Sequence, residues 1–209
     1  MRDVRMFLVM CAVAATAAFP YAVSAATFGG EVFGAYNTYS MEDVNDDIDA
    51  LNAAGGDFDK FGSGMTGGLG LRMWASPQFM LAAHWEPLFL ETDDSGVTLN
   101  ADANSYQLTG GYFFPSTSNA KYGIGAGLGY YTLAGSIESP IGSTDADGSG
   151  VGFHVLGMGE WTVSPGFGIT AGAGYRFADI EIDDSGGEKM DYSGFMGRVG
   201  LAFYLPSGQ

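Results

Sequence analysis

Residues 192–205 read Tyr-Ser-Gly-Phe-Met-Gly-Arg-Val-Gly-Leu-Ala-Phe-Tyr-Leu, and their side chains alternate between two kinds. From Phe195 to Leu205, every second residue is large and apolar except Gly197, whereas the intervening set contains Gly, Ala and Arg198. A period of two indicates a β-strand that has different surroundings on its two faces. The apolar face would pack on a second sheet in a soluble sandwich, but would contact lipid in a membrane barrel.

The composition is typical of a single all-β domain whose sheet curves strongly. The chain has 209 residues with 34 Gly and 14% aromatic residues, yet only 7 Pro. Glycine is therefore well above its usual share of about 7%, without a collagen repeat or the Pro excess of low-complexity chains. Such a mixture lets rings pack against small neighbours in a tight sheet.

Residues 1–26 are predicted to be a cleaved signal peptide, which leaves residues 27–209 as the β-domain. Arg2 and Arg5 give a basic start, an apolar run covers residues 6–19, and Ser24-Ala25-Ala26 offers small residues for cleavage. The single cysteine, Cys11, lies in this segment. The mature chain would then have no disulfide, cysteine ligand or cysteine nucleophile.

The remaining chain divides into eight strand-like segments. They are residues 27–39, 61–75, 79–90, 103–114, 122–134, 151–163, 166–178 and 192–205. Each segment reaches the length of about 9–11 residues that a tilted transmembrane strand needs. The sequence therefore predicts an eight-stranded antiparallel up-and-down transmembrane β-barrel.

The connections between these segments alternate between short and long. Residues 76–78, 115–120 and 164–165 are short and contain Pro, whereas residues 40–60, 91–102, 135–150 and 179–191 are long and acidic. Outer-membrane barrels have short periplasmic turns and longer extracellular loops. We therefore expect the long connections to be extracellular loops and both termini to be periplasmic.

The first long connection carries the only helical signal. Ser40 can cap a helix over residues 41–54, in which Val44, Ile48 and Leu51 form an apolar stripe at helical spacing. This stripe either packs against the barrel rim or forms a partner-binding face, and the pattern permits both.

Charged residues are sorted by location. The formal net charge is −16, and all acidic residues after residue 26 lie in the long connections except Glu31, Glu86 and Glu160. When the large apolar residues are placed outward, the charged strand residues and both histidines share the inward face. These inward residues are Glu31, Arg72, His84, Glu86, His154, Glu160, Arg176 and Arg198. Because Arg or Lys facing lipid at mid-membrane costs about 2–4 kcal/mol, this sorting favours the membrane barrel.

The eight inward residues are predicted to form an ion-pair network in the lumen. We expect Glu31 to pair with Arg72 and Arg198 toward the periplasmic end, with Glu160 nearby. His84, Glu86, His154 and Arg176 would form an upper group. This network either supports and plugs the barrel or lines a permeation pathway.

Outward aromatic residues are predicted to form girdles at the two membrane interfaces. The lower girdle would contain Phe28, Phe114, Tyr122, Trp161, Phe167 and Phe203, and the upper one Tyr36, Phe89, Tyr106, Tyr130, Phe153 and Tyr175.

Enzymatic and cofactor signals are weak. No Ser, His and Asp can be placed at one level of the predicted barrel, so we expect neither catalysis nor a cofactor. Asp145 and Asp147 have the opening spacing of a calcium loop, but its final acidic position is occupied by Leu156. The acidic loops can still bind divalent cations weakly, and the negative charge disfavours nucleic-acid binding.

The chain resembles the small outer-membrane barrels, the superfamily that includes OmpA-, OmpX- and OmpW-like proteins. The resemblance covers residues 27–209, and its most specific part is Arg198, Gly200, Phe203 and Leu205, which look like the family's assembly signal. Family members often end on an aromatic residue, whereas residues 206–209 follow Leu205 here. The resemblance implies outer-membrane lipid and the barrel-assembly machinery as partners.

Two functions remain open from the sequence. The first is a monomeric structural or surface-interaction barrel with a plugged lumen, whose acidic loops meet cation-bridged lipopolysaccharide or a host or phage partner. The alternative is narrow, porin-like transport of small or hydrophobic solutes, as the resemblance to OmpW-like proteins implies.

Overall fold

The computed structural model describes residues 26–40, 42–53, 55, 57, 60, 62–94, 97–139, 142–183 and 189–205. The predicted signal peptide, apart from Ala26, and residues 206–209 lie outside this part of the chain. In the described residues, no helix is both long and apolar enough to cross a membrane.

The described chain contains nine strands and one helix. These are β1 (Thr27–Thr38), α2 (Glu42–Ala53), β2 (Ser63–Trp74), β3 (Phe79–Asp94), β4 (Val97–Phe113), β5 (Ala120–Ser139), β6 (Gly142–Ser164), β7 (Phe167–Ile182), β8 (Lys189–Asp191) and β9 (Gly194–Tyr204). Each strand from β1 to β7 pairs antiparallel with the next, and β9 pairs with both β7 and β1.

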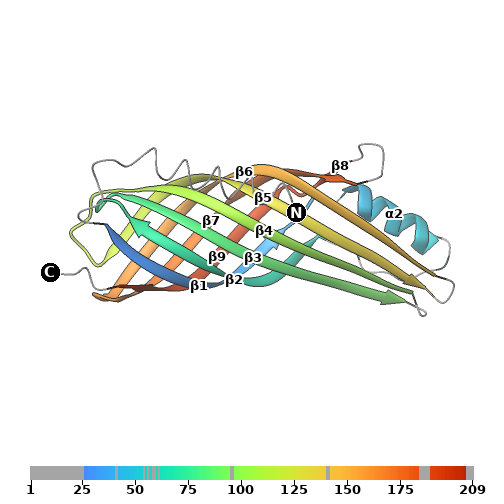
Figure 1. Ribbon diagram of the computed structural model, residues 1–209, viewed down its shortest axis with the longest axis horizontal. Coiled ribbons are helices and arrows are strands. Elements are labelled where there is room, and N and C mark those ends of the chain that lie inside the picture. The colour runs from blue at the N-terminus through green and yellow to red at the C-terminus, as the bar shows by residue number, and fades with distance from the viewer. Residues whose placement is uncertain are drawn as a thin grey trace.

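The wall therefore closes as an eight-stranded up-and-down barrel, as the sequence predicted (Figure 1). The short strand β8 pairs with β7 beyond the last β7–β9 pair and occupies the same place in the wall as β9. Tyr192 and Ser193 interrupt this eighth strand position, which the sequence had predicted as one strand over residues 192–205.

The two ends of the barrel differ. One, which we call the turn end, holds the short connections, the start of β1 and the end of β9; the other, the hairpin end, holds α2 and the tips of the β3–β4 and β5–β6 hairpins (Figure 1). Ile48 of α2 is buried, and the helix contacts β8. The side chains of Val44 and Leu51, the other members of the predicted stripe, lie outside the described residues.

Three of the four predicted long loops contain paired strand, and in residues 179–191 the pairs are Asp179↔Asp191, Ile180↔Met190 and Glu181↔Lys189. The β3–β4 ladder continues to Asp94↔Val97 and the β5–β6 ladder to Ser139↔Gly142, so residues 91–102 and 135–150 are mainly paired strand. Acidic residues made these segments resemble loops, but a strand that projects beyond the membrane can carry charge, since water rather than lipid surrounds it. The β-sheet therefore extends well past the apolar band of the wall.

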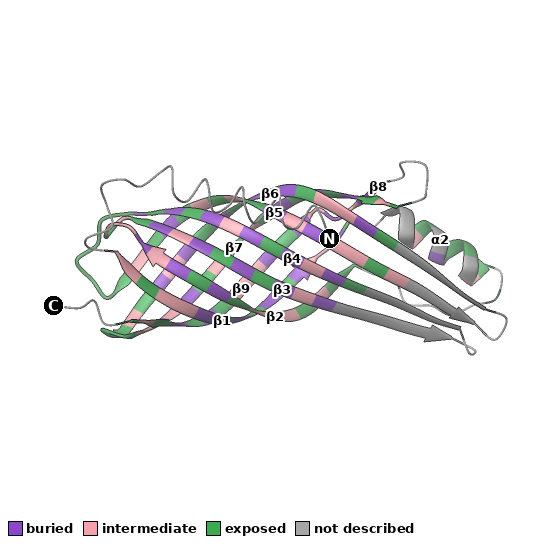
Figure 2. Cartoon of the chain, viewed as in Figure 1, coloured by how far each residue is buried: buried purple, intermediate pink, exposed green. Residues whose placement is uncertain are grey.

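Burial alternates along the strands as the period of two predicts (Figure 2). Outward apolar residues are exposed around the whole barrel, which is the state expected of side chains that contact lipid. The exposed aromatic residues include Phe28, Tyr36, Phe79, Tyr106, Tyr112, Phe114, Tyr122, Phe153, Trp161, Tyr175, Phe195 and Phe203. The side chain of Phe89, a predicted girdle residue, lies outside the described residues.

Inward glycines of β5 make room for large side chains in the narrow lumen. A Cβ atom at Gly125 would lie 2.5 Å from Met158 Sδ, and one at Gly127 would lie 2.6 Å from His154 Nε2 and collide with the carbonyl oxygen of Leu108. This close approach explains why the alternate residues of β5 lack side chains.

Two apolar clusters fill the lumen at opposite levels. The cluster toward the hairpin end contains Tyr39, Leu88, Ala103, Tyr131, Ala178, Ile180, Met190 and Tyr192. The cluster toward the turn end contains Trp74, Met80, Ala82, Phe113, Leu156 and Met158. Polar and charged side chains occupy the lumen between and around them.

We predict that Gly127→Ala destabilises the barrel by about 1–3 kcal/mol, the usual cost of overpacking. The expected measurement is urea unfolding of the refolded barrel in lipid vesicles. Gly157→Ala is the matched control, because Gly157 faces outward and a Cβ there would meet only the Ala173 carbonyl oxygen, at 3.8 Å. Equal stability of the two variants would contradict the packing described for β5.

Candidate functional site

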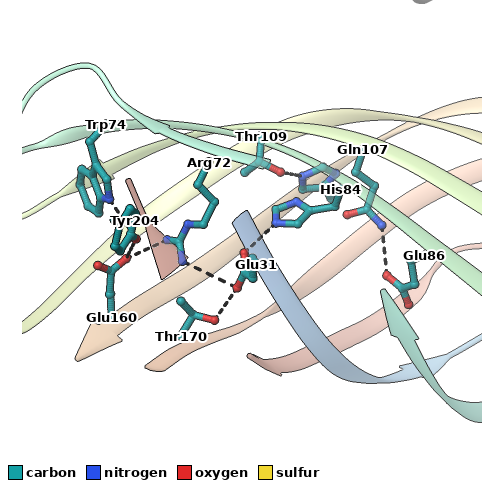
Figure 3. Close-up of polar contacts among 11 residues, drawn as sticks. Glu31, Arg72, Trp74, His84, Glu86, Gln107, Thr109, Glu160, Thr170 and Tyr204 are labelled. Carbon is teal, nitrogen blue, oxygen red and sulfur yellow. Dashed lines mark hydrogen bonds and ion pairs between the residues drawn. The ribbon is translucent and has the colours of Figure 1, made fainter. Parts of the chain in front are cut away.

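The charged cluster nearest the turn end links β1, β2 and β6 across the lumen. Arg72 Nη2 lies 3.0 Å from Glu160 Oε2, and Arg72 Nη1 lies 3.7 Å from Glu31 Oε1 (Figure 3). The contact between Arg72 and Glu31 is an ion pair, but its distance is too long for a hydrogen bond. All three side chains are buried, so their pairing offsets the desolvation of each charge.

Glu31 has two further partners. His84 Nε2 lies 3.1 Å from Glu31 Oε2, and the Thr170 hydroxyl donates to Glu31 Oε1 (Figure 3). Gly70 pairs with both Glu31 and His84 in the adjacent ladders, and a Cβ at Gly70 would lie 2.6 Å from His84 Cδ2. The absence of a side chain at Gly70 therefore lets His84 reach across β2 to Glu31.

The prediction that His84 belongs to the upper group is thus wrong. His84 and Glu86 are both inward on β3, but they bond to different partners in different layers of the lumen. Strand parity gave the correct face for His84 but could not predict which layer its ring would join.

Aromatic residues extend the cluster to the turn end. Tyr204 Oη donates to Glu160 Oε2 at 2.7 Å and accepts from Trp74 Nε1 at 3.1 Å. The ammonium of Lys121 lies 4.6 Å from the centre of the Trp74 ring. Sequence reasoning missed Trp74 and Tyr204 as network members, although both have the inward parity of their strands.

Glu86 lies in a separate polar layer. It accepts a hydrogen bond from Gln107 Nε2 at 3.5 Å (Figure 3) and another from Asn37 Nδ2 at 2.5 Å. Gln107 also donates to Ser105 Oγ at 2.7 Å. Neutral amides thus stabilise this carboxylate where an Arg176 partner was expected.

Arg176 is bound by an aromatic cage. The carbon of its guanidinium lies 4.2 Å from the Tyr192 ring centre, 5.2 Å from that of Tyr39 and 5.5 Å from that of Tyr131. Its Nε also donates to the Tyr192 carbonyl oxygen at 2.9 Å. Burial raises the pKa of Tyr39, which follows the end of β1, so its phenol stays neutral beside the cation. The cage occupies the lumen below the hairpin end.

His154 joins neither Glu86 nor Arg176 through a side-chain hydrogen bond among the described residues. Its Nε2 lies 2.9 Å from the hydroxyl of Thr109, and its ring fills the space above Gly127. The predicted upper group is therefore three separate arrangements, around Glu86, Arg176 and His154.

Arg198 lies beside the Glu31 and Arg72 cluster, as predicted, but without the predicted ion pair to Glu31 among the described residues. Glu31 pairs with Arg72 and His84, and the ion pairs among the described residues include no Glu31–Arg198 pair. The guanidinium of Arg198 lies 5.7 Å from the Phe33 ring centre. It also lines two small lumen cavities of about 10 Å³ each.

The described lumen contains three buried carboxylates, Glu31, Glu86 and Glu160, and three guanidiniums, Arg72, Arg176 and Arg198, while the ammonium of Lys121 lies over the Trp74 ring at the turn end. The six charges come from β1, β2, β3, β6, β7 and β9, so the network connects most of the wall. Such an arrangement can brace and close a barrel, because breaking one pair leaves a buried charge uncompensated.

The calcium-loop geometry is not present. Asp145 and Asp147 lie in β6 and pair with Ser136 and Ala134 of β5, so their backbone is extended rather than looped. The Asp147 side chain is exposed, and that of Asp145 lies outside the described residues. Nor do any three His, Cys, Asp or Glu residues group as a metal site in the described part of the chain.

The residues that resemble an assembly signal lie at the closing seam of the wall. Gly200 faces inward, and a Cβ there would lie 2.8 Å from the Val32 carbonyl oxygen of β1. Phe203 and Leu205 are exposed on the outer face. Leu205 N donates to the Phe28 carbonyl oxygen at 2.9 Å, just beyond the end of β9. Recognition of these residues by an assembly machinery stays a prediction.

Comparison with known proteins finds similarity at the level of the fold. No protein-family model matches the sequence, and no curated protein does either. Several solved structures match over nearly their whole length at low identity.

Neisserial surface protein A is 14% identical, with a TM-score of 0.53 over 86% of this chain and 97% of that one. A major outer membrane protein from Thermus thermophilus is 12% identical, with a TM-score of 0.55 over 87% of this chain and 100% of that one. The outer membrane protein OprG from Pseudomonas aeruginosa is 10% identical, with a TM-score of 0.53 over 86% and 95%.

At these identities the likeness to the three proteins concerns architecture only. This chain has the fold of the small eight-stranded outer-membrane β-barrels, the superfamily that its sequence resembles.

Proposed function

We propose that this protein is a monomeric structural and surface-interaction barrel of the bacterial outer membrane, with a lumen closed by its own side chains. The observation that carries the closed lumen is Arg72, which pairs with Glu31 on one side and with Glu160 on the other. The apolar cluster around Tyr131 and Tyr192 adds a second closure toward the hairpin end. The interior of an eight-stranded barrel is just wide enough for side chains to fill.

The proposed orientation places the turn end in the periplasm and the hairpin end outside the cell. The start of β1 and the end of β9 both lie at the turn end, as expected for a chain that enters from the periplasm. Hairpins longer than the membrane requires then project into the external medium. The assembly machinery would meet the chain on the periplasmic side, as the resemblance implies.

The projecting surface would meet the lipopolysaccharide layer or a cationic partner. Exposed acidic residues gather on α2, on the loop after it and along the upper parts of β4, β6 and β7. They are Asp46, Asp49, Asp57, Asp102, Asp147, Asp179, Glu181 and Asp183. Divalent cations can bridge such carboxylates to the phosphates of lipopolysaccharide.

We predict that the purified wild-type barrel gives no stepwise conductance in planar bilayers. Arg72→Ala should give brief conductance steps, since Glu31 and Glu160 lose the cation that joins them. Lys60→Ala is the control, because the Lys60–Asp49 pair is exposed outside the wall. Regular open-channel steps in the wild type would contradict the closed lumen.

A second candidate function is lateral passage of small apolar solutes, and one feature of the wall favours it. The β2–β3 pairing ends at Leu69↔Trp85, although both strands continue toward the hairpin end. Pro87 lacks the N–H that a ladder would require, and its carbonyl oxygen accepts from the hydroxyl of Thr66 instead. At this seam between β2 and β3, the Thr66 side chain contacts Pro87 of the other strand. Nearer the turn end, the same two strands are joined by backbone pairs.

Thr66→Val should therefore loosen the seam without unfolding the barrel. We expect amides of residues 63–68 to exchange with deuterium at least several-fold faster in this variant, while amides of residues 69–74 are unchanged. Thr109→Val, which alters an inward threonine away from the seam, is the control. If Thr66→Val also speeds uptake of a small apolar dye into proteoliposomes, lateral passage is supported; no uptake in either protein would exclude it.

A further inference from the structure

We propose that the lumen holds two internal water molecules, one on each side of Arg198. The first would connect Arg198 to Asn37 and Glu86, and the second would connect it to the layer of Arg72, His84 and Glu31. These binding sites go beyond the proposed surface role and do not depend on it.

The first observation is a pair of cavities of suitable size. One is lined by Asn37, Glu86, Leu156, Met196 and Arg198, among others, and measures about 10 Å³. The other has the same volume. Its lining includes Glu31, Arg72, His84, Gly172 and Arg198. A cavity needs a volume of about 10–15 Å³, measured in the same way, to hold one water molecule.

The second observation is a set of buried polar atoms without hydrogen-bond partners in the described part of the chain. Two of them, Asn37 Oδ1 and Arg198 Nη1, belong to residues that line the first cavity. Arg72 Nε, Arg72 Nη1 and His84 Nδ1 belong to residues that line the second, as does Arg198. Buried polar groups in folded proteins are rarely left unpaired, and ordered water is their common partner.

The donors and acceptors suit water at the first cavity. The Asn37 amide nitrogen is committed to Glu86, so Asn37 Oδ1 is an acceptor. Arg198 Nη1 can only donate. A water molecule accepts from Arg198 and donates to Asn37, with its second hydrogen available to Glu86.

The same reasoning holds at the second cavity. Because a carboxylate only accepts, the hydrogen in the His84–Glu31 contact belongs to His84 Nε2. A neutral imidazole then has a lone pair on Nδ1, which is an acceptor, whereas Arg72 Nε is a donor. A water molecule accepts from Arg72 and donates to His84.

Size and charge favour water over an ion at both sites. A cation in either cavity would lie beside the guanidinium of Arg198, and an anion would lie beside Glu86 or Glu31. Chloride is also larger than the water-sized space available. Neutral water can satisfy the unpaired donors and acceptors together, and it adds no charge to the lumen.

This assignment gives Arg198 a defined role. Its guanidinium would join the Glu86 layer to the Glu31 layer through one water molecule on each side. The network then runs from Gln107 through Glu86, Arg198 and Arg72 to Glu160, although no direct ion pair of Arg198 with Glu31 is found among the described residues.

The test uses a methyl group placed between the two cavities. Gly172 lines both, and a Cβ there would lie 3.3 Å from Arg198 Nε, 3.4 Å from Arg198 Cγ and 3.6 Å from Leu156 Cδ1. Gly172→Ala therefore removes space, and the flexible Arg198 side chain has to shift by a few tenths of an ångström. Gly157→Ala on the neighbouring strand makes the same change on the outer face and serves as the matched control.

Crystal structures of the three refolded barrels, at a resolution that shows ordered water, provide the readout. Oxygen-17 relaxation dispersion counts long-lived internal water in solution. We expect one water in each cavity of the wild type and of Gly157→Ala, and the loss of at least one in Gly172→Ala. Unoccupied cavities in the wild type, an inorganic ion in place of water, or an unchanged water count in Gly172→Ala would each overturn the proposal.

Discussion

Lipid outside a narrow barrel forces the charged strand residues within the apolar band inward, and this constraint governs the rest of the structure. A charge on the outer face would cost several kcal/mol, as would an unpaired charge inside. The chain meets both conditions with three carboxylates and three guanidiniums in one lumen. Arg72 illustrates the solution, because one cation serves Glu31 and Glu160 at once.

Glycine is what makes this crowding possible. Gly70 lets His84 cross a strand to Glu31, and Gly127 gives the His154 ring its space. The lumen is therefore packed by pairing a missing side chain on one strand with a large one on its neighbour. On the outer face, Gly157 leaves the wall without a projecting side chain. Glycine therefore shapes both sides of the wall.

The sequence predicted the architecture because the period of two is a local property. Each strand shows its own inward and outward faces, and counting eight such strands is enough for the barrel. Partner choice could not be predicted in the same way, since it depends on the stagger between neighbouring strands and on rotamers in a shared space. Parity placed His84 and Arg176 inside, but only the register reveals that one meets Glu31 and the other a tyrosine cage.

The projecting hairpins show a second limit of sequence reasoning. Acidic residues in residues 91–102 and 135–150 suggested loops, because charge and strand rarely coincide inside a membrane. Beyond the apolar band this rule no longer applies, and the ladders continue in water to Asp94↔Val97 and Ser139↔Gly142. The proposed surface role rests on the side chains that fill the lumen below and on the paired strands that project above.

The three tryptophans test the central claim. It states that one face of each strand contacts lipid, whereas the other face points into a lumen filled by side chains. Trp85 and Trp161 are 41% and 56% exposed on the outer face, whereas Trp74 is 8% exposed inside. Single-tryptophan variants, made by Trp→Phe substitution at the other two positions, would be refolded into vesicles of brominated lipid. We expect strong quenching of Trp85 and Trp161 and little quenching of Trp74. Equal quenching of all three, or quenching of Trp85 and Trp161 by aqueous iodide alone, would contradict the account.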